Sequence, residues 1–337
     1  MSIRHRSRSP HPDSGRQKSQ SGVLTITILS MLTLPETDLV VHELCLGGNV
    51  FGWGADESGS RAVLDAYRGH GGNFIDTADV YSEWKPGNQG GESETIIGNW
   101  LKGQDRSKFV IATKVSLWSK RPGLRPENII AACNESLQRL QTDFIDIYYS
   151  HKDDSSVPIA ETLGAYQQLI NEGKIRYIAA SQHTGARLQE ALDTAAEHGL
   201  PSYIALQDRY NLMDREPFES EQQDVLTRNQ ISAIPFYGLA RGFLSGKYRK
   251  GVTVESVRSE GVKEYETDRG YEVVDALTEI ARAHHSSPSA VALAWIRSNP
   301  AVSTPIASAR TVEQLSEIVE VVHLSDVEVK MLNRASA

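Results

Sequence analysis

Four polar residues stand at the ends of strand-like runs, and their types suit proton transfer. Asp76, Lys114 and His151 directly follow apolar or aromatic runs, and Tyr81 comes five residues after Asp76. In a barrel of parallel strands, the carboxyl ends of the strands converge on one mouth, where active sites lie. We therefore expect the four side chains to meet. A phenol has a pKa of about 10. A lysine ammonium beside Tyr81 would lower that pKa, so the set predicts acid–base chemistry.

Each of these residues has a simpler explanation when it is taken alone. Asp76 can cap the next loop, and Lys114 can be a surface lysine that pairs with any acid. His151 precedes Lys-Asp-Asp and can be a solvated loop residue. Single motif matches carry a high false-positive risk. Their joint occurrence at the ends of successive predicted strands favours the functional interpretation.

Eight strand-like runs recur at intervals that suit a repeating strand–helix unit. They lie at 43–47, 73–77, 109–114, 144–150, 175–180, 203–207, 231–236 and 303–307. Apolar stripes at helix spacing lie between them, for example Ile129, Cys133 and Leu140 after Pro126. The pattern predicts an α/β fold, a (β/α)8 TIM barrel. An open doubly wound sheet is the alternative, but residues 47–52 lack the glycine fingerprint that it would need.

The rest of the chain predicts one barrel domain, residues 31–337, with a short hairpin at its start. Residues 32–34 and 40–46 flank a Pro-Glu-Thr-Asp turn. The polar stretch 246–270 predicts a long loop, followed by helices over 271–283 and 288–297. Residues 1–30 are rich in Ser and Arg and predict a disordered extension. A secretory signal and a transit peptide are alternatives for this segment, although no Ala-x-Ala-like cleavage site follows it.

Charge and cysteine content narrow the class of protein. The net charge is −8. Residues 1–30 contribute +4, so the remainder carries −12 by subtraction. Such an acidic body argues against nucleic acid as a partner, and no run is long enough to span a membrane. The two cysteines, Cys45 and Cys133, have no metal-ligand spacing and predict buried free thiols. We therefore expect a cytoplasmic protein without a metal site.

Several stretches resemble the aldo-keto reductase family and follow its order along the chain. They read FIDTADVY at 74–81, GESE at 91–94, TKV at 113–115, YYSH at 148–151, GKIRYI at 173–178, QDRYNL at 207–212, LARGFLSGK at 239–247 and PIASAR at 305–310. The resemblance covers the chain from about residue 34 to its end. It implies that the hairpin caps the bottom of the barrel. It also implies that a small-molecule carbonyl is the substrate.

The family's chemistry assigns a role to each of the four polar residues. Carbonyl reduction needs a hydride at carbon and a proton at oxygen. Tyr81 would donate the proton as general acid, and Lys114 would favour the phenolate. Asp76 would pair with Lys114 and hold it in place. His151 would donate a hydrogen bond to the carbonyl oxygen.

The resemblance also implies a nicotinamide cofactor, NADP(H), bound across the barrel mouth. Ser181, Gln182 and Gln207 would bind the carboxamide, and Phe236 would stack on the ring. Arg310 precedes a predicted helix over 311–322 and would read a 2′-phosphate. The other expected cofactor-binding residues are Gly48, Asn49, Asp76, Tyr237, Gly238, Leu239, Ala240, Lys247, Ser308, Gln314 and Glu317. The chain departs from the family at Gln182 and at Ile318, where the family usually has Asn.

Substrate choice and two competing functions stay open at this point. Trp53, Trp84 and Trp118 follow predicted strands and can line an aromatic pocket, although each can equally anchor a loop. The chain also resembles the nicotinamide-binding beta subunits of potassium channels, which act mainly by association and lack a His at the position of His151. A barrel isomerase or lyase using Tyr81 and Lys114 is a third hypothesis, which the expected cofactor residues disfavour. Oligomeric state cannot be read from the sequence.

Overall fold

Eight parallel strands form one sheet in the order β10-β3-β4-β5-β6-β7-β8-β9. The computed structural model describes residues 31–252, 254 and 259–337. The strands are β3 (Cys45–Gly47), β4 (Phe74–Asp76), β5 (Val110–Val115), β6 (Ile145–Ser150), β7 (Ile175–Ser181), β8 (Tyr203–Gln207), β9 (Ser232–Ala233) and β10 (Ile306–Ala307). Every one of these strands overlaps one of the eight predicted runs.

Hydrogen bonds between the two edge strands close the sheet. The Ala233 amide donates to the Ala301 carbonyl over 2.7 Å, and the Ile306 amide donates to the Pro235 carbonyl over 2.8 Å. The Ser303 amide returns a bond to the Ala233 carbonyl over 3.0 Å. A closed barrel has no free sheet edge. The predicted (β/α)8 fold is therefore confirmed.

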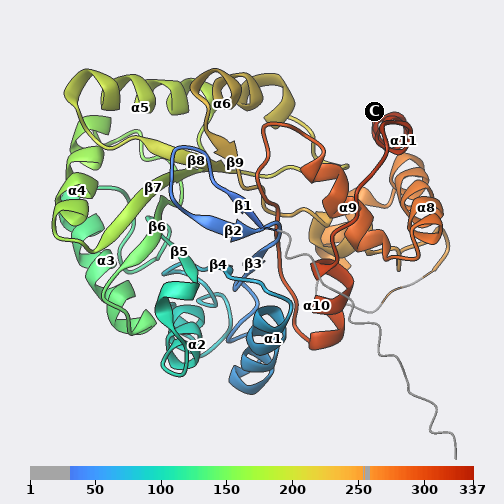
Figure 1. Cartoon of the computed structure of the whole chain (residues 1–337), viewed down its shortest axis with the longest axis horizontal. Helices are drawn as coiled ribbons and strands as arrows, with labels where there is room; N and C mark the ends of the chain where they lie inside the picture. The colour runs from blue at the N-terminus through green and yellow to red at the C-terminus, as the bar shows by residue number, and fades with distance from the viewer. Residues whose placement is uncertain (1–30, 253, 255–258) are drawn as a thin grey trace, which may run out of the picture.

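Helices surround the strands, as Figure 1 shows. They are α1 (Glu57–Gly69), α2 (Glu92–Leu101), α3 (Pro126–Leu140), α4 (Ile159–Asn171), α5 (Gly185–His198), α6 (Gln223–Asn229), α7 (Ser259–Val262), α8 (Asp268–Ala283), α9 (Pro288–Arg297), α10 (Val312–Val319) and α11 (Asp326–Ala335). The local sequence explains the bounds of α5. The Thr184 side chain accepts from the Arg187 amide at its start, and Gly199 ends it in the left-handed region at φ 63°. No described helix is long and apolar enough to cross a membrane.

Two apolar cores hold the barrel together. The larger core lies between the strands and the surrounding helices, and it includes Leu46, Ile97 and Leu188. The smaller core fills the barrel interior and includes Phe74, Val110 and Tyr149. The interior is therefore packed, as expected for eight strands. The polar side chains that face the interior lie at the carboxyl ends of the strands.

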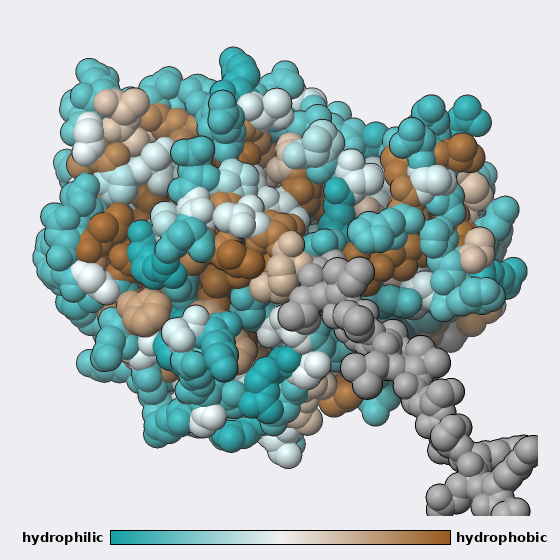
Figure 2. Space-filling model, viewed as in Figure 1, coloured by the Kyte–Doolittle hydropathy of each residue, from teal (hydrophilic) through white to brown (hydrophobic). Residues whose placement is uncertain are grey.

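A hairpin plugs the bottom of the barrel, as predicted. It pairs β1 (Met31–Thr33) with β2 (Val40–His42) in antiparallel register. Leu34, Leu39 and Val41 are buried in the same core as the barrel interior. In Figure 1 the hairpin lies across the middle of the ring of strands. Figure 2 shows apolar side chains gathered near the middle of this face, within a polar surround.

The polar stretch 246–270 contains more structure than the sequence predicts. Its described part holds α7, a 3-10 turn at Lys263–Tyr265 and the first turn of α8. Tyr265 is buried, and its hydroxyl donates to Asp214 over 2.8 Å, which anchors this segment to the loop after β8. A tertiary contact therefore orders a segment whose composition predicts a loop. Residues 1–30, predicted to be a disordered extension, lie outside the described residues, so that prediction and the boundary at residue 31 stay predictions.

Candidate active site

Polar side chains line the barrel interior at its mouth, the end where the strands have their carboxyl ends. Alternate residues of each strand point into the barrel, so residues two positions apart share this side. An inward-facing apolar residue precedes each polar one by two positions. The pairs are Phe74 and Asp76, Ala112 and Lys114, Tyr149 and His151, Ala179 and Ser181, and Ala205 and Gln207. The polar member always lies at or just past the carboxyl end of its strand. The barrel therefore brings together residues that are up to 131 positions apart.

Lys114 is the centre of this polar layer. Its Nζ donates to Asp76 Oδ2 over 2.6 Å, to the Thr77 carbonyl over 2.7 Å and to the Tyr81 hydroxyl over 2.9 Å. The exposed fractions of the Lys114 and Asp76 side chains are 0% and 2%. The ammonium thus uses all three of its donors, and it is fixed in position. The structure brings the predicted Asp, Tyr and Lys into direct contact.

The pKa of Tyr81 moves in the direction opposite to the one predicted. Burial, followed by the Asp76 carboxylate, raises the pKa of the Tyr81 hydroxyl well above its ordinary value. The Tyr81 hydroxyl lies 3.4 Å from Asp76 Oδ2, and the same oxygen already takes up the Lys114 charge. The net pKa of Tyr81 in the free protein is therefore raised, and not lowered as the sequence predicted. Tyr81 is a phenol that stays protonated at neutral pH.

His151 faces the Tyr81 ring and is neutral. The two ring centres are 5.8 Å apart in an edge-to-face arrangement. Burial, followed by the nearby Lys114 charge, lowers the pKa of His151 well below its ordinary value. Its Nδ1 is buried and has no hydrogen-bond partner among the described residues. A neutral imidazole beside the phenol can donate a hydrogen bond to an oxygen in the mouth.

The three residues expected to bind a carboxamide have different surroundings. Gln207 donates from Nε2 to Asp76 Oδ1 over 2.9 Å and is buried. Ser181 Oγ is also buried, with no hydrogen-bond partner in the described part of the chain. Gln182 is exposed, and its Nε2 donates to the His151 carbonyl over 3.0 Å. Since a buried unpaired hydroxyl costs free energy, Ser181 is the group here that most needs an external partner.

The turn after β9 supplies free backbone donors. Phe236 is half-buried against the interior core, and the exposed Tyr237 follows it. The amides of Gly238 and Leu239 donate no hydrogen bond to other described residues. The exposed Lys247 lies nearby, since its Nζ would be 4.0 Å from a Cβ on Gly242. Free amides and an ammonium together suit an anion such as a diphosphate.

Other residues expected to bind the cofactor come from two distant segments that meet. Ser308 Oγ donates to Asn49 Oδ1 over 2.5 Å. Arg310 packs along the loop after β3, because a Cβ on Gly54 would be 3.1 Å from Arg310 Cδ. Gln314 Oε1 accepts from the Arg310 amide over 3.0 Å, just before α10 begins. The remaining members are Gly48, whose amide donates to the Asp76 carbonyl over 2.7 Å, and Glu317, which is exposed.

Ile318, which stands where the family usually has Asn, is 3% exposed and belongs to the larger core. Its side chain therefore packs inward from α10. A side chain so placed contributes to folding. It is not available to an adenine ring.

Two of the three tryptophans form an aromatic wall with Tyr81. Trp84 lies edge-to-face with Tyr81 at 6.1 Å and with Trp53 at 6.0 Å, measured between ring centres. Trp84 is 50% exposed, which is unusual for so large an apolar ring. Trp118 makes other contacts: it is 9% exposed, its Nε1 donates to the Gln89 carbonyl over 2.8 Å, and Arg139 lies 5.2 Å from its ring centre. Trp118 thus anchors a loop.

A buried carboxylate that the sequence analysis missed supports the strand of Lys114. Glu94 on α2 is fully buried. It accepts from Thr113 Oγ1 over 2.5 Å and from Arg139 Nε over 2.6 Å. Thr113 directly precedes Lys114 on β5, and Arg139 lies on α3. Through its bonds to both residues, Glu94 connects β5 to α2 and α3. The sequence signal that could have identified Glu94 is an acidic residue within the apolar stripe that Ile97 and Trp100 form.

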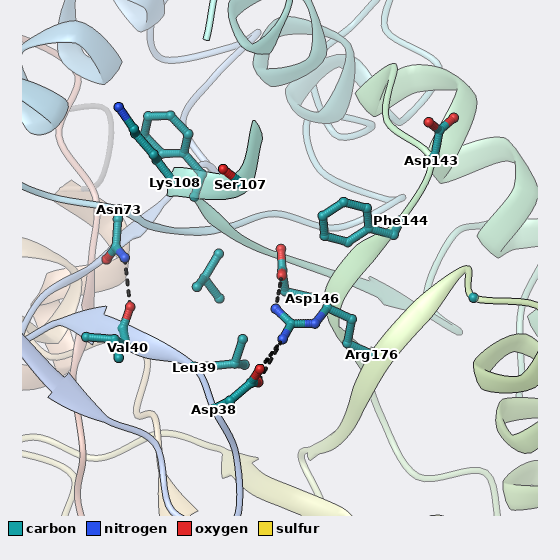
Figure 3. A pocket seen from close by; sticks show the side chains of 13 residues that line it. Asp38, Leu39, Val40, Asn73, Ser107, Lys108, Asp143, Phe144, Asp146 and Arg176 are labelled. Atoms are coloured by element: carbon teal, nitrogen blue, oxygen red, sulfur yellow. Dashed lines mark hydrogen bonds and ion pairs between the residues drawn. The ribbon is translucent and has the colours of Figure 1, made fainter. Parts of the chain in front are cut away.

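A large cavity lies at the opposite end of the barrel. Its volume is about 500 Å³, and residues of the hairpin and of the loops before β5 and β6 line it (Figure 3). Asp146, 1% exposed, accepts from Arg106, Arg176 and the Ile111 amide over 2.7, 2.9 and 2.9 Å. Arg176 also binds Asp38 through two contacts of 2.7 and 2.8 Å. Each charge of this network has a close partner, so we interpret the cleft as structural.

No group of three or more His, Cys, Asp or Glu side chains is arranged to hold a metal ion within the described ranges. Both cysteines are buried and free, as predicted.

Comparisons with known proteins agree with this geometry. The model of the Aldo/keto reductase family matches residues 43–337. "Protein tas" of Escherichia coli (strain K12) is 33% identical over 320 residues, which cover 86% of this chain and 92% of that protein. "Uncharacterized oxidoreductase YrpG" of Bacillus subtilis (strain 168) is 32% identical over 314 residues, 89% and 94% of the two chains. "Probable voltage-gated potassium channel subunit beta" of Arabidopsis thaliana is 32% identical over 302 residues, 86% and 90%.

Proposed function

The chain belongs to the aldo/keto reductase family, and on that premise we propose that it is an NADPH-dependent reductase of small aldehydes or ketones. The observation that carries this proposal is the contact of the Tyr81 hydroxyl with Lys114 Nζ at 2.9 Å, together with the Lys114–Asp76 pair at 2.6 Å. A phenol held against a buried ammonium can give up a proton and leave its negative charge stabilised.

The four polar residues divide the work of proton transfer. Tyr81 stays protonated in the free protein and donates its proton to the carbonyl oxygen. Lys114 stabilises the phenolate that results, and Asp76 holds the ammonium in place. His151, neutral at pH 7, donates a hydrogen bond that orients the carbonyl and shares its developing charge. The apolar core in the barrel interior lies beneath the site and excludes water from that side.

A bound NADPH supplies the hydride in this proposal, and the residues present suit it. The unpaired Ser181 hydroxyl and the Gln207 amide would take the carboxamide. The free amides of Gly238 and Leu239 suit the diphosphate. Arg310, beside the first turn of α10, suits a 2′-phosphate, and this favours NADPH over NADH. The two buried, free thiols suit a reducing compartment, so we also propose that the protein works in the cytoplasm.

A second candidate is a nicotinamide-binding regulatory subunit. The similarity to a protein named as a potassium channel beta subunit favours it. The presence of His151 next to Tyr81 favours catalysis, because a purely regulatory protein does not need a hydrogen-bond donor beside the phenol.

The decisive experiment follows NADPH absorbance with the purified protein and a panel of aldehydes and ketones. Turnover of any of them, faster with NADPH than with NADH, supports the reductase. Tight binding of NADPH without turnover of any carbonyl would favour the regulatory subunit. Failure to bind either nicotinamide would refute both candidates.

A further inference from the structure

Two arginines stand on either side of an exposed tyrosine at the barrel mouth. The guanidinium carbons of Arg209 and Arg241 lie 5.2 and 5.4 Å from the centre of the Tyr237 ring. Tyr237 is 38% exposed. A guanidinium within about 6 Å of a ring centre is attracted to it. The tyrosine therefore holds two positive charges near each other in a chain whose net charge is −8.

The continuation of β8 and β9 places this group at the mouth. Arg209 pairs with Phe236 as a parallel bridge, and the Phe236 amide donates to the Asp208 carbonyl over 3.0 Å. Asn211 Nδ2 donates to the Tyr237 carbonyl over 2.9 Å. After burial and Asp76, Tyr237 is a further cause that raises the pKa of Tyr81. The two guanidinium groups thus lie at the same end of the barrel as the reactive phenol.

The backbone that carries Arg241 is strained. Tyr237, Ala240 and Arg241 have φ values of 57°, 45° and 57°, and Gly242 follows at 97°. Residues other than glycine rarely adopt this left-handed region, and such strain gathers at ligand clamps. Arg241 Nε is also buried, and it has no hydrogen-bond partner among the described residues.

Most of the hydrogen-bond donors of the two guanidinium groups are unused. Each group has five N–H donors. Within the described residues, the only hydrogen bond that either guanidinium makes joins Arg241 Nη1 to the Gly261 carbonyl over 3.4 Å. The ion pairs are loose, at 4.0 Å from Arg209 to Asp214 and 3.7 Å from Arg241 to the exposed Glu264. Donors that are held in place but unpaired are suited to a ligand.

We propose that Arg209 and Arg241, held on either side of Tyr237, form an anion subsite that binds the phosphate or carboxylate group of a small molecule at the barrel mouth. The inference rests on the proposed function, which provides two sources of that anion. One is the diphosphate of the cofactor, whose free backbone donors lie in the same turn. The other is an acidic group on the carbonyl substrate, since Arg209 and Arg241 lie at the same end of the barrel as Tyr81. Planar guanidinium groups suit either anion through paired hydrogen bonds.

The test compares the wild type with the double variant Arg209→Gln/Arg241→Gln. Arg282→Gln is the control, because Arg282 is exposed on α8 and its loss also changes the net charge. Three quantities are measured: the dissociation constant of NADPH by fluorescence, the affinity for inorganic pyrophosphate by calorimetry, and the Michaelis constants for benzaldehyde and for its para-carboxy derivative at saturating NADPH. The two binding measurements need no turnover, so they test the subsite even if the reductase activity is absent.

The source of the anion decides which quantity changes. If it is the cofactor, the double variant binds NADPH and pyrophosphate roughly tenfold to a hundredfold more weakly, with both Michaelis constants unchanged. If it is the substrate, only the Michaelis constant for the carboxylated aldehyde rises by that factor. Arg241→Lys should recover part of the loss, because the charge returns without the planar fork. A double variant that matches Arg282→Gln in all these measurements would overturn the proposal.

Discussion

The Asp146 network at the bottom of the barrel and the Lys114 layer at the mouth both contain buried charges, but they differ in how those charges are satisfied. At the bottom, the Asp146 carboxylate accepts three hydrogen bonds of 2.7 to 2.9 Å, and its two arginines are paired in turn. At the mouth, Lys114 and Asp76 are paired as closely, yet their surroundings contain unpaired polar atoms. These are Ser181 Oγ, His151 Nδ1 and Arg241 Nε.

The difference separates stability from function. A buried polar group without a partner destabilises the folded chain. Such groups persist where a ligand satisfies them or where chemistry uses them. The bottom cleft has a volume of about 500 Å³, yet it offers no unpaired charge within the Asp146 network. The volume of this cleft alone is therefore no evidence for a ligand site.

The sharpest test of this comparison makes the same change at both ends. Tyr81→Phe keeps the ring and its packing but removes the transferable proton. We expect carbonyl reduction to fall by roughly 10²–10⁴-fold, as for the loss of a general acid, with NADPH binding unchanged. Tyr177→Phe is the matched control, because the Tyr177 hydroxyl donates to Asp38 at the bottom over 2.9 Å. Steady-state kinetics of both variants provide the measurement. Most of the activity surviving in Tyr81→Phe would show that another group supplies the proton.

Asp146→Ala tests the bottom of the barrel, where we expect a loss of stability without a loss of activity. The substitution removes the acceptor of three hydrogen bonds and leaves two arginines without their buried partner. Breaking a buried ion pair costs about 3–5 kcal/mol. We expect a loss near the lower end of that range, because Arg106 and Arg176 keep 17% and 36% side-chain exposure and can be hydrated. Urea unfolding measures the loss, and kcat of the folded fraction should not change. Asp143→Ala, at an exposed residue lining the same cleft, is the control. An equal, small loss in both variants would mean that the Asp146 network contributes little.

Arg310→Ala tests whether the mouth distinguishes the two nicotinamides. A charge-assisted contact with an anion contributes about 1.5–3 kcal/mol. We expect NADPH to bind roughly tenfold to a hundredfold more weakly, while NADH, which has no 2′-phosphate, binds as before. The loss should shrink in high salt, because Arg310 is half-exposed. Fluorescence titration at two ionic strengths gives both constants. Equal weakening for both nicotinamides would indicate that Arg310 supports the start of α10 instead.

The sequence was sufficient to predict which polar residues meet, because that depends on strand periodicity. Asp76, Lys114 and His151 end successive strands, and closure of the barrel brings them together whatever the loops do. The surroundings that tune them could not be predicted in the same way. The pKa direction of Tyr81 depends on its burial and then on the Asp76 carboxylate beside it.

Other features escaped prediction because they depend on three-dimensional contacts. Trp118 follows a strand as Trp84 does, and its burial and its contacts with Gln89 and Arg139 show that it is a loop anchor. The unused donors of Arg209 and Arg241 depend on where the fold places the two guanidinium groups, and the sequence around neither residue reveals this. Polar composition likewise concealed the ordered segment around Tyr265.

The smallest effect that we predict is the pH dependence of stability that His151 contributes at the mouth. Burial and Lys114 keep the pKa of His151 far below 6.5 in the folded chain, whereas the unfolded chain titrates at about 6.5. Below that pH, unfolding takes up a proton, so the free energy of unfolding falls with falling pH, by at most about 1.4 kcal/mol per pH unit for one group. Above pH 7 both states are neutral and the dependence vanishes.

His42 and His183 have lowered pKa values from burial as well, so the wild type is compared with His151→Gln, which retains them. We expect the stability difference between the two proteins to be constant from pH 7 to 8 and to decrease below pH 6.5. Urea unfolding at intervals from pH 5 to 8 measures it. A difference that stays constant over the whole range would mean that His151 has the same pKa in both states, and then Lys114 would not control its charge.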